Sequence, residues 1–288
     1  MEIKIAASAG FCFGVKRAVK LAVEAAAKYP DQQIFTLGPI IHNPQVVARL
    51  ADQGIRQLDN LEEIPPGIII IRSHGVTRQV LAKLQGQAGV TIIDATCPFV
   101  RRAQKIVAQM AAENYRIIIV GEHNHPEVTA LLSYGRPEAT RAIPGPEEVA
   151  ALLADGRKSG KTALLAQTTQ SYENYAAVAN RLLPLKGECR CFNTICDATS
   201  DRQEESRRIA ADSDCMIIIG GYDSANTTRL YQLCREILPA SHHIETPGQL
   251  RREWFQGCRR VGVTAGASTP KWLIDEVAAR ISRLADNR

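Results

Sequence analysis

Short apolar runs rich in isoleucine and valine alternate along this chain with longer segments of helical character. Clear examples of such runs are 34–37, 68–71, 117–120, 163–166 and 216–219. Runs that are apolar at nearly every position are typical of strands buried on both faces, as in parallel sheets covered by helices. Because strands and helices alternate, the pattern predicts right-handed βαβ units and an α/β fold.

Three cysteines occupy equivalent positions in this pattern, each between a strand and the helix that follows it. They are Cys12, Cys97 and Cys196, and a second strand ends in glycine 24 to 26 residues after each of them. This repeat predicts three similar small parallel-sheet domains in a pseudo-threefold, three-lobed arrangement around a centre where the cysteines meet. We expect the domain boundaries to be 1–90, 91–187 and 188–288.

Polar side chains gather at the carboxyl ends of the predicted strands, where open parallel sheets bind their ligands. They include His42, His74, His125, Glu127, Thr168, Ser224, Asn226 and Ser268. Histidine, serine and asparagine, with the backbone N–H groups of helix N-termini, suit the oxygens of a phosphate. The simpler alternative is helix capping for the serines and the asparagine, and an ordinary satisfied polar role for each histidine.

Glu127 is the candidate acid of this set. A carboxylate in an enclosed cavity has a raised pKa and can deliver protons. The alternative is a carboxylate that the helix dipole favours in a first helical turn. Thr168 either orients a substrate hydroxyl or caps the helix that starts near Tyr172.

The three repeated cysteines suit metal chemistry. Thiolates hold iron–sulfur clusters, usually four to a cubane, so three leave one iron with an open position that can act as a Lewis acid. A zinc site with three cysteines and three unrelated buried cysteines are the alternatives. For the other five cysteines we expect packing roles; they are Cys189, Cys191, Cys215, Cys234 and Cys258.

Composition narrows the class of protein. The 288 residues carry a formal charge of +5 with basic and acidic residues interspersed, which suits an anionic small molecule. Aromatic residues make up only 5%, too few to favour stacking on nucleic acid bases. No apolar run approaches the roughly 18 residues of a membrane span, and the start of the chain lacks the pattern of a secretory signal. We therefore expect a cytoplasmic protein that binds neither nucleic acid nor membrane, with reduced thiols.

Six short signatures, in this order along nearly the whole chain, resemble the 4-hydroxy-3-methylbut-2-enyl diphosphate reductase family of the non-mevalonate isoprenoid pathway. They are Gly10-Phe11-Cys12-Phe13-Gly14-Val15, Asp94-Ala95-Thr96-Cys97-Pro98, His125-Pro126-Glu127, Gln167-Thr168-Thr169, Asn193-Thr194-Ile195-Cys196 and Thr264-Ala265-Gly266-Ala267-Ser268-Thr269-Pro270. Each signature is short, but together they are specific.

The resemblance implies a three-lobed fold around a central 4Fe-4S cluster, held by Cys12, Cys97 and Cys196, in which one iron lacks a protein ligand. It implies reductive removal of an allylic hydroxyl, which binds the open iron, giving isopentenyl and dimethylallyl diphosphates. Glu127 would be the proton donor, with Thr168 in the relay, and electrons would arrive singly from ferredoxin or flavodoxin. The diphosphate would be held by His42, His74, His125, Ser224, Asn226 and Ser268.

Two positions depart from the family pattern. Ala225 stands where many members have a second serine, so one hydroxyl for the diphosphate is missing. Asn124 stands where glycine is frequent before His-Pro-Glu, and asparagine tolerates left-handed backbone better than most residues. A hydro-lyase with an open-iron cluster and a cluster-bearing redox sensor are the alternative functions. Dependence on a reductant separates the first from a reductase, and a sensor has no use for an acid and an anion clamp.

Overall fold

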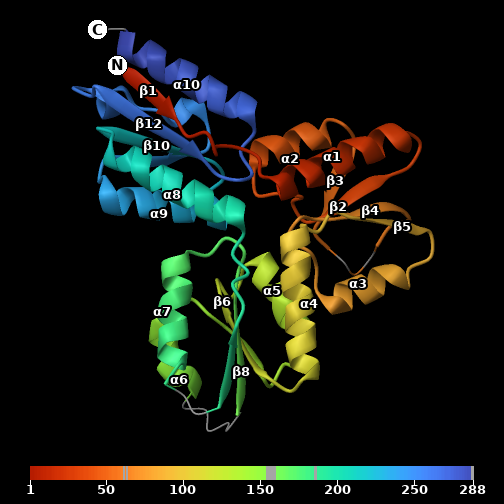
Figure 1. Ribbon diagram of the computed structural model, residues 1–288. Helices are drawn as coiled ribbons and strands as arrows, with labels where there is room; N and C mark the ends of the chain where they lie inside the picture. The colour runs from red at the N-terminus through yellow and green to blue at the C-terminus, as the bar shows by residue number, and fades with distance from the viewer. Residues whose placement is uncertain (61, 63, 154–159, 185–186, 287–288) are drawn as a thin grey trace. The chain divides into compact units, whose positions relative to one another are not determined.

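Three four-stranded parallel sheets form the framework of the described chain, as the apolar runs predict (Figure 1). The computed structural model describes residues 1–60, 62, 64–153, 160–184 and 187–286. The strand orders are β3-β2-β4-β5, β7-β6-β8-β9 and β11-β10-β12-β1, which are equivalent to one another. The α/β class and the three similar parallel sheets are therefore confirmed, while the pseudo-threefold arrangement stays a prediction.

The strands are short, and most of the central ones are buried along their whole length. Their bounds are β1 Glu2–Ile5, β2 Ile34–Leu37, β3 Ile55–Leu58, β4 Gly67–Ile71, β5 Val90–Asp94, β6 Arg116–Val120, β7 Thr140–Ile143, β8 Lys161–Ala166, β9 Glu188–Cys191, β10 Cys215–Ile219, β11 Ser241–Ile244 and β12 Arg260–Ala265. In β6, alternate residues pack into two different apolar clusters, with Ile117 on one face and Ile118 on the other. Burial on both faces is the reason that these runs contain no polar alternation.

The strand before each repeated cysteine belongs to a different sheet from the one expected. The predicted domain boundaries placed β1, β5 and β9 in the same domains as the cysteines that follow them. The structure instead pairs β1 with β12, β5 with β4 and β9 with β8, each at the edge of its sheet. A hydrophobic pattern specifies which faces are buried but not which neighbour completes a ladder. The domain boundaries themselves stay a prediction.

Two compact units divide the chain. The first contains Met1–Lys16, Ile41–Arg49 and Asp197–Arg288, and the second contains Arg17–Ile40 and Leu50–Cys196. In the first unit, α10 (Lys271–Asp286) covers one face of the sheet through side chains such as Val277. Helices α8 (Asp197–Ala211) and α9 (Ala225–Ile237) cover the other face (Figure 1).

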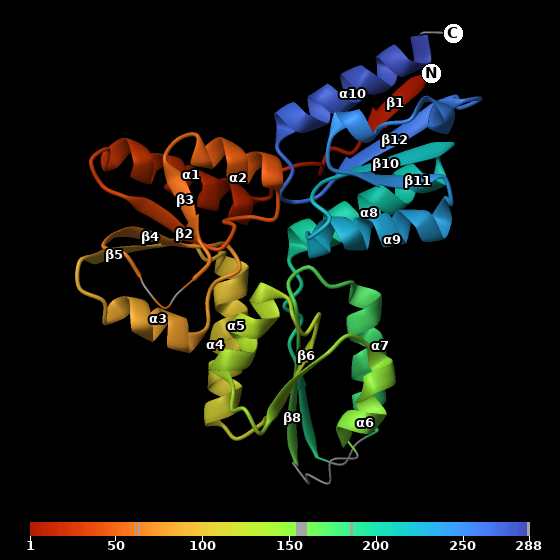
Figure 2. The same ribbon diagram turned by 180° about the vertical axis from the view of Figure 1, so that it is seen from behind.

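The second unit holds the other two sheets. Helices α4 (Pro98–Ala112) and α5 (Pro126–Tyr134) cover one face of the β7-β6-β8-β9 sheet, and α7 (Tyr172–Leu182) covers the opposite face (Figure 2). The remaining helices are α1 Phe13–Lys28, α2 Pro44–Ala51, α3 Arg78–Gln85 and α6 Val149–Leu153, with short 3-10 turns at Pro146–Glu148, Pro247–Gln249 and Arg252–Phe255. Of the helices described, none has the length and apolar character needed to cross a membrane.

The helices after the three cysteines begin at the very next residue. Helices α1, α4 and α8 start at Phe13, Pro98 and Asp197. Helix α4 shows the reason, because Pro98 occupies its first turn, where proline has no N–H to lose. Each of the three cysteines thus lies directly at a helix N-terminus.

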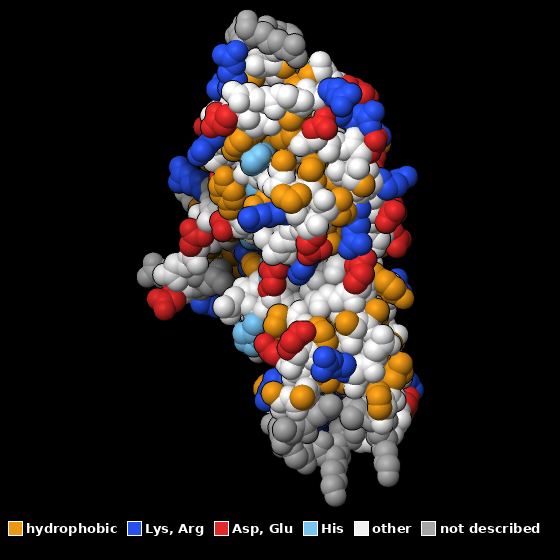
Figure 3. Space-filling model, turned by 90° about the vertical axis from the view of Figure 1, so that its left-hand side faces the viewer, with side chains coloured by type: hydrophobic (Ala, Val, Ile, Leu, Met, Phe, Trp, Pro, Cys, Tyr) orange, Lys and Arg blue, Asp and Glu red, His pale blue; other side chains and the backbone are white. Residues whose placement is uncertain are grey.

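The surface carries mixed charge. On the face drawn in Figure 3, lysine and arginine side chains alternate with aspartate and glutamate side chains. Several charged side chains of the described chain form ion pairs, for example Arg260 with Glu2 and Lys271 with Asp275. The modest net charge of +5 is therefore distributed rather than gathered on this face.

Candidate active site

A buried carboxyl group, Glu127, is the centre of the site in the second unit. It lies in the first turn of α5 and is only 1% exposed. Its Oε1 accepts a hydrogen bond from the backbone N–H of Thr168 at 2.7 Å, and its Oε2 accepts one from the Thr168 hydroxyl at 2.8 Å. Residues 41 positions apart are thereby joined at the carboxyl ends of neighbouring strands β6 and β8.

Burial changes the acidity of this group. Desolvation raises the pKa of Glu127 from 4.5 to about 7, although both hydrogen bonds from Thr168 lower it. Desolvation dominates because a buried carboxylate loses its water, and two hydrogen bonds replace only part of that hydration. A carboxyl group with a pKa near 7 can hold a proton and release it at neutral pH.

Thr168 also connects the acid to one of the repeated cysteines. Its backbone carbonyl accepts the N–H of Cys196 at 3.0 Å. The loop before Cys196 is fixed by Thr194, whose hydroxyl bonds both the N–H and the carbonyl of Ala166 at the end of β8. A single residue therefore sets the position of the carboxyl group and of the backbone at Cys196.

The Cys97 turn is held by groups from two other elements. The Cys97 N–H donates to the carbonyl of Ser73 at 2.9 Å, beside His74. The guanidinium of Arg17 donates to the carbonyls of Thr96 and Asp94, both at 3.2 Å. The sequence motifs gave Arg17 no role, although it lies only three residues after Gly14 of the glycine-flanked turn.

Two histidines of the second unit lie beside the acid. His125 is the N-cap of α5, and its Nδ1 accepts the N–H of Glu127 at 3.1 Å. In the neutral ring this leaves the proton on Nε2, so that Nε2 is a donor. The ring of His74 lies edge-on to that of His125, with centroids 5.5 Å apart. Both the capping role and a donor role are therefore available to His125.

The first unit contains the other five predicted residues, and four of them lie in the turn after β12 or bond to it. The backbone carbonyl of Ala267, in the turn after β12, accepts a hydrogen bond from the Cys12 N–H at 3.2 Å. The N–H of Ala267 donates to Oδ1 of Asn226 at 3.0 Å, and the hydroxyl of Ser268 donates to the carbonyl of His42 at 3.0 Å. Ser224 is the N-cap of α9, with its Oγ accepting the N–H of Thr227.

Asn226 has one group left for a ligand. Its side chain is 4% exposed, and its Nδ2 has no hydrogen-bond partner among the residues that the structure describes. A buried amide N–H₂ without a partner costs free energy unless a bound group accepts from it. An anion at the N-terminus of α9 is such a group.

Gly10 is required by its backbone conformation and by its packing. Gly10 has a φ of +105°, a conformation that L side chains rarely adopt, and an added Cβ would lie 3.3 Å from Ile274 Cδ1 in α10. Packing of the turn against α10 therefore already demands glycine at this position.

The cysteine chemistry fits a thiolate-held cluster at the three repeated positions. None of the eight cysteines forms a disulfide. Cys215 and Cys234 are buried, and burial raises the pKa of each thiol to about 12, which opposes the thiolate form that a metal needs. Cys12, Cys97 and Cys196 are instead partly exposed at helix N-termini, so their sulfurs can reach a bound group.

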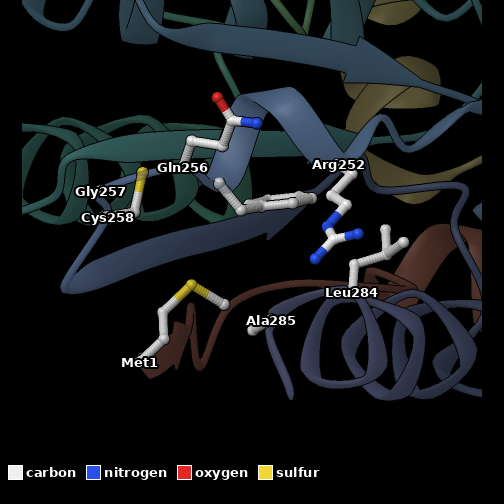
Figure 4. Close-up of a pocket in the computed structure, with 8 residues that line it drawn as sticks. Met1, Arg252, Gln256, Gly257, Cys258, Leu284 and Ala285 are labelled. Carbon is white, nitrogen blue, oxygen red and sulfur yellow. The ribbon is translucent and has the colours of Figure 1, made fainter. Parts of the chain in front are cut away.

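A cavity of about 840 Å³ lies elsewhere in the first unit (Figure 4). Its lining is Met1, Arg252, Phe255, Gln256, Gly257, Cys258, Leu284 and Ala285. None of these residues belongs to the predicted site. Volume alone therefore does not identify the catalytic centre of this protein.

The predicted residues thus form two sets. The first unit gathers Cys12, His42, Ser224, Asn226 and Ser268, and the second gathers His74, Cys97, His125, Glu127, Thr168 and Cys196. Within each set, backbone hydrogen bonds join the residues at strand ends. The meeting of the two sets, and of the three cysteines, stays a prediction.

Comparison with known proteins agrees with these features. The family model described as LytB protein matches residues 3–282. A protein of Geobacter sulfurreducens named 4-hydroxy-3-methylbut-2-enyl diphosphate reductase is 51% identical over 288 residues, covering 100% of this chain and 99% of that protein. A protein of Pelobacter propionicus with the same name is 48% identical over 284 residues, covering 99% of each chain.

Two solved structures are also similar. One, described as (E)-4-hydroxy-3-methyl-but-2-enyl diphosphate reductase, the terminal enzyme of the non-mevalonate pathway, is 43% identical with a TM-score of 0.70, and the match covers 98% of this chain and 100% of that one. The other, the E-1-hydroxy-2-methyl-but-2-enyl-4-diphosphate reductase from Plasmodium falciparum, is 26% identical with a TM-score of 0.86, covering 99% of this chain and 88% of that one.

Proposed function

Because this chain belongs to the LytB protein family and is a reductase, we propose that it reduces 4-hydroxy-3-methylbut-2-enyl diphosphate to isopentenyl diphosphate and dimethylallyl diphosphate. The reaction takes up two electrons and two protons, breaks the allylic C–O bond and releases water. Carbon receives one proton and the leaving oxygen the other. The observation that carries the proposal is the buried Glu127 carboxyl group, with its pKa raised to about 7 and held by Thr168 beside Cys196.

The cofactor that we propose is a 4Fe-4S cluster held by Cys12, Cys97 and Cys196. When bound, it supplies electrons one at a time and offers one iron without a protein ligand as a Lewis acid. The physiological electron donor that we propose is ferredoxin or flavodoxin, both of which deliver single electrons.

Glu127 acts as the proton donor for the leaving hydroxyl. In its protonated form it can donate from Oε2 to the Thr168 hydroxyl, whose own proton then faces the substrate. Thr168 keeps the carboxyl group in one orientation through its N–H and hydroxyl, so that no rearrangement is needed during transfer. Glu127 is only 1% exposed, so bulk water does not compete for its proton.

The diphosphate is held by His42, His74, His125, Ser224, Asn226 and Ser268. Two helix N-termini support this assignment, since His125 is the N-cap of α5 and Ser224 that of α9. The Nδ2 of Asn226 adds a buried donor without a competing partner among the described residues. Backbone N–H groups and neutral donors of this kind bind phosphate oxygens well at helix N-termini.

The test uses protein purified anaerobically, with its iron and sulfide counted. With an artificial one-electron reductant and the diphosphate substrate, we expect both products, and without reductant we expect none. Product formation without any reductant would exclude the reductase and favour a hydro-lyase. Glu127→Gln is expected to keep the iron and the substrate affinity but to lose turnover, and a near-normal rate would remove Glu127 from the mechanism.

A further inference from the structure

Two cysteines outside the proposed active site form a pair. Cys189 and Cys191 lie two residues apart on β9, so their side chains point to the same side of the sheet. Their Sγ atoms are 3.9 Å apart. Cys191 is exposed and Cys189 is partly buried, so a small ligand can reach both sulfurs. The sequence reading assigned both cysteines to packing.

The backbone leaves this pair on an open edge. Strand β9 is the last in the order β7-β6-β8-β9. Its ladder to β8 uses the N–H groups of Glu188 and Phe192, which bond the carbonyls of Gly160 and Leu164. In a parallel ladder the bonded residues alternate, so the N–H groups of Cys189 and Cys191 face away from β8. Small adjustments of the two cysteines therefore break no ladder hydrogen bond.

A buried hydroxyl adds a third polar group. Cys191 pairs with Leu164, whose side chain packs with Tyr175 of α7 on the same face. Tyr175 is 5% exposed, and its hydroxyl has no hydrogen-bond partner among the residues described. This phenol is therefore available to a ligand of the pair.

The spacing of the sulfurs favours a metal ion over a disulfide. Two thiolates at about 2.3 Å from a tetrahedral ion stand about 3.8 Å apart, close to the observed separation. A disulfide needs sulfurs at about 2.05 Å, and same-face neighbours in a strand have Cα atoms about 6.6 Å apart, near the upper limit for a bridge. Metal binding requires almost no movement, whereas a disulfide requires the strand to bend.

We propose that Cys189 and Cys191 form a chelating dithiol site for a soft divalent cation of the zinc class, separate from the cysteines of the proposed cluster. Both thiols lose their protons as the ion binds, so two Cys–S⁻ ligands replace two water molecules of the hydrated ion, and no electron is transferred. The Tyr175 hydroxyl, on the same face of the sheet and without a hydrogen-bond partner among the described residues, is the third group that we assign to the site. The remaining positions stay open to exchangeable ligands.

The experiment titrates the anaerobic, cluster-bearing protein with Zn²⁺ against a chromophoric zinc chelator. The variants are Cys189→Ser, Cys191→Ser, the double variant and Tyr175→Phe, with Cys258→Ser as the matched control because it is also partly exposed. We expect wild type and control to bind one more zinc ion per chain than the double variant. Either single substitution should weaken that site roughly 100-fold, because the second thiolate no longer binds intramolecularly. Tyr175→Phe should weaken it several-fold.

Iron content and reductant-dependent turnover are measured on the same samples, and they should be unchanged in all five variants. Equal zinc binding by the double variant would overturn the site, as would single variants that bind like wild type. A mass lower by two hydrogen atoms together with no zinc uptake would overturn it in favour of a disulfide. An unchanged zinc affinity in Tyr175→Phe would overturn the proposal that the Tyr175 hydroxyl contributes to the site.

Discussion

Replacing Thr168 by valine should move the pH dependence of turnover to higher pH. The acid must be protonated to act, so the rate of the wild type should fall as pH rises through about 7, the raised pKa of Glu127. The Thr168 hydroxyl donates to Oε2 at 2.8 Å and stabilises the carboxylate form. Its removal therefore raises the pKa of Glu127 further, although the N–H of residue 168 still donates to Oε1.

The size of the shift follows from the strength of one charge-assisted hydrogen bond. Such a bond contributes about 1.5 to 3 kcal/mol, and each pKa unit corresponds to about 1.4 kcal/mol. The alkaline limb of the profile should therefore move up by at most about one to two pH units in Thr168→Val, because the protonated carboxyl group also loses its weaker bond to this hydroxyl. The plateau at low pH should also fall if the hydroxyl relays the proton, but the position of the limb is independent of that loss.

The assay measures kcat between pH 6 and about 10 with an artificial one-electron reductant in excess, so that electron delivery does not limit the rate. Thr168→Ser is the matched control, because it keeps the hydroxyl and should leave the limb near the wild-type position. Iron is counted in every sample, since Thr168 also bonds the Cys196 backbone. An unshifted limb, or one shifted to lower pH, would refute the role given to this hydrogen bond.

Three further predictions concern other parts of the site. Cys12→Ser should lose most of the bound iron, whereas Cys258→Ser should keep it; full iron in the first variant would refute that ligand. Ala225→Ser should lower KM about two- to tenfold by adding one neutral hydrogen bond to the diphosphate, and an equal or higher KM would count against this loop as an anchor. Glu127→Gln should raise the Tm relative to wild type increasingly from pH 5 to pH 8. The reason is that the pKa of Glu127 is raised from 4.5 to about 7 in the folded state. Between these pH values the unfolded wild type ionises before the folded one does, so the free energy of unfolding of the wild type falls by about 3 kcal/mol, and glutamine has no such loss. A Tm difference independent of pH would contradict the raised pKa.

The apolar runs were sufficient to predict the strands and the class of fold. Strands such as β2 and β4 begin and end close to the expected residues, because a run buried on both faces leaves a nearly continuous apolar signal. The order of strands within each sheet follows from short right-handed connections. The exception is the edge position of β1, β5 and β9, whose pairing depends on contacts distant in sequence.

The sequence motifs pointed to the residues of the candidate site but not to the hydrogen bonds between them. Short motifs identified Glu127 and Thr168 separately, whereas their two hydrogen bonds span 41 positions and no local pattern encodes them. The roles of Arg17 and Thr194 in fixing the two cysteine turns were missed for the same reason. The left-handed turn that Gly10 makes against α10 likewise depends on a segment distant in sequence.

The sequence by itself determined what is local: the apolar runs, the glycine-flanked cysteine turn at residues 10–14 and the acid after His125-Pro126. Only the tertiary structure decided the quantities that depend on packing between distant segments. It buries Glu127 so that its carboxyl group has a pKa near 7, and it leaves the thiols of Cys189 and Cys191 side by side on an open sheet edge. Both outcomes follow from burial and neighbours, which a pattern of residue types cannot specify.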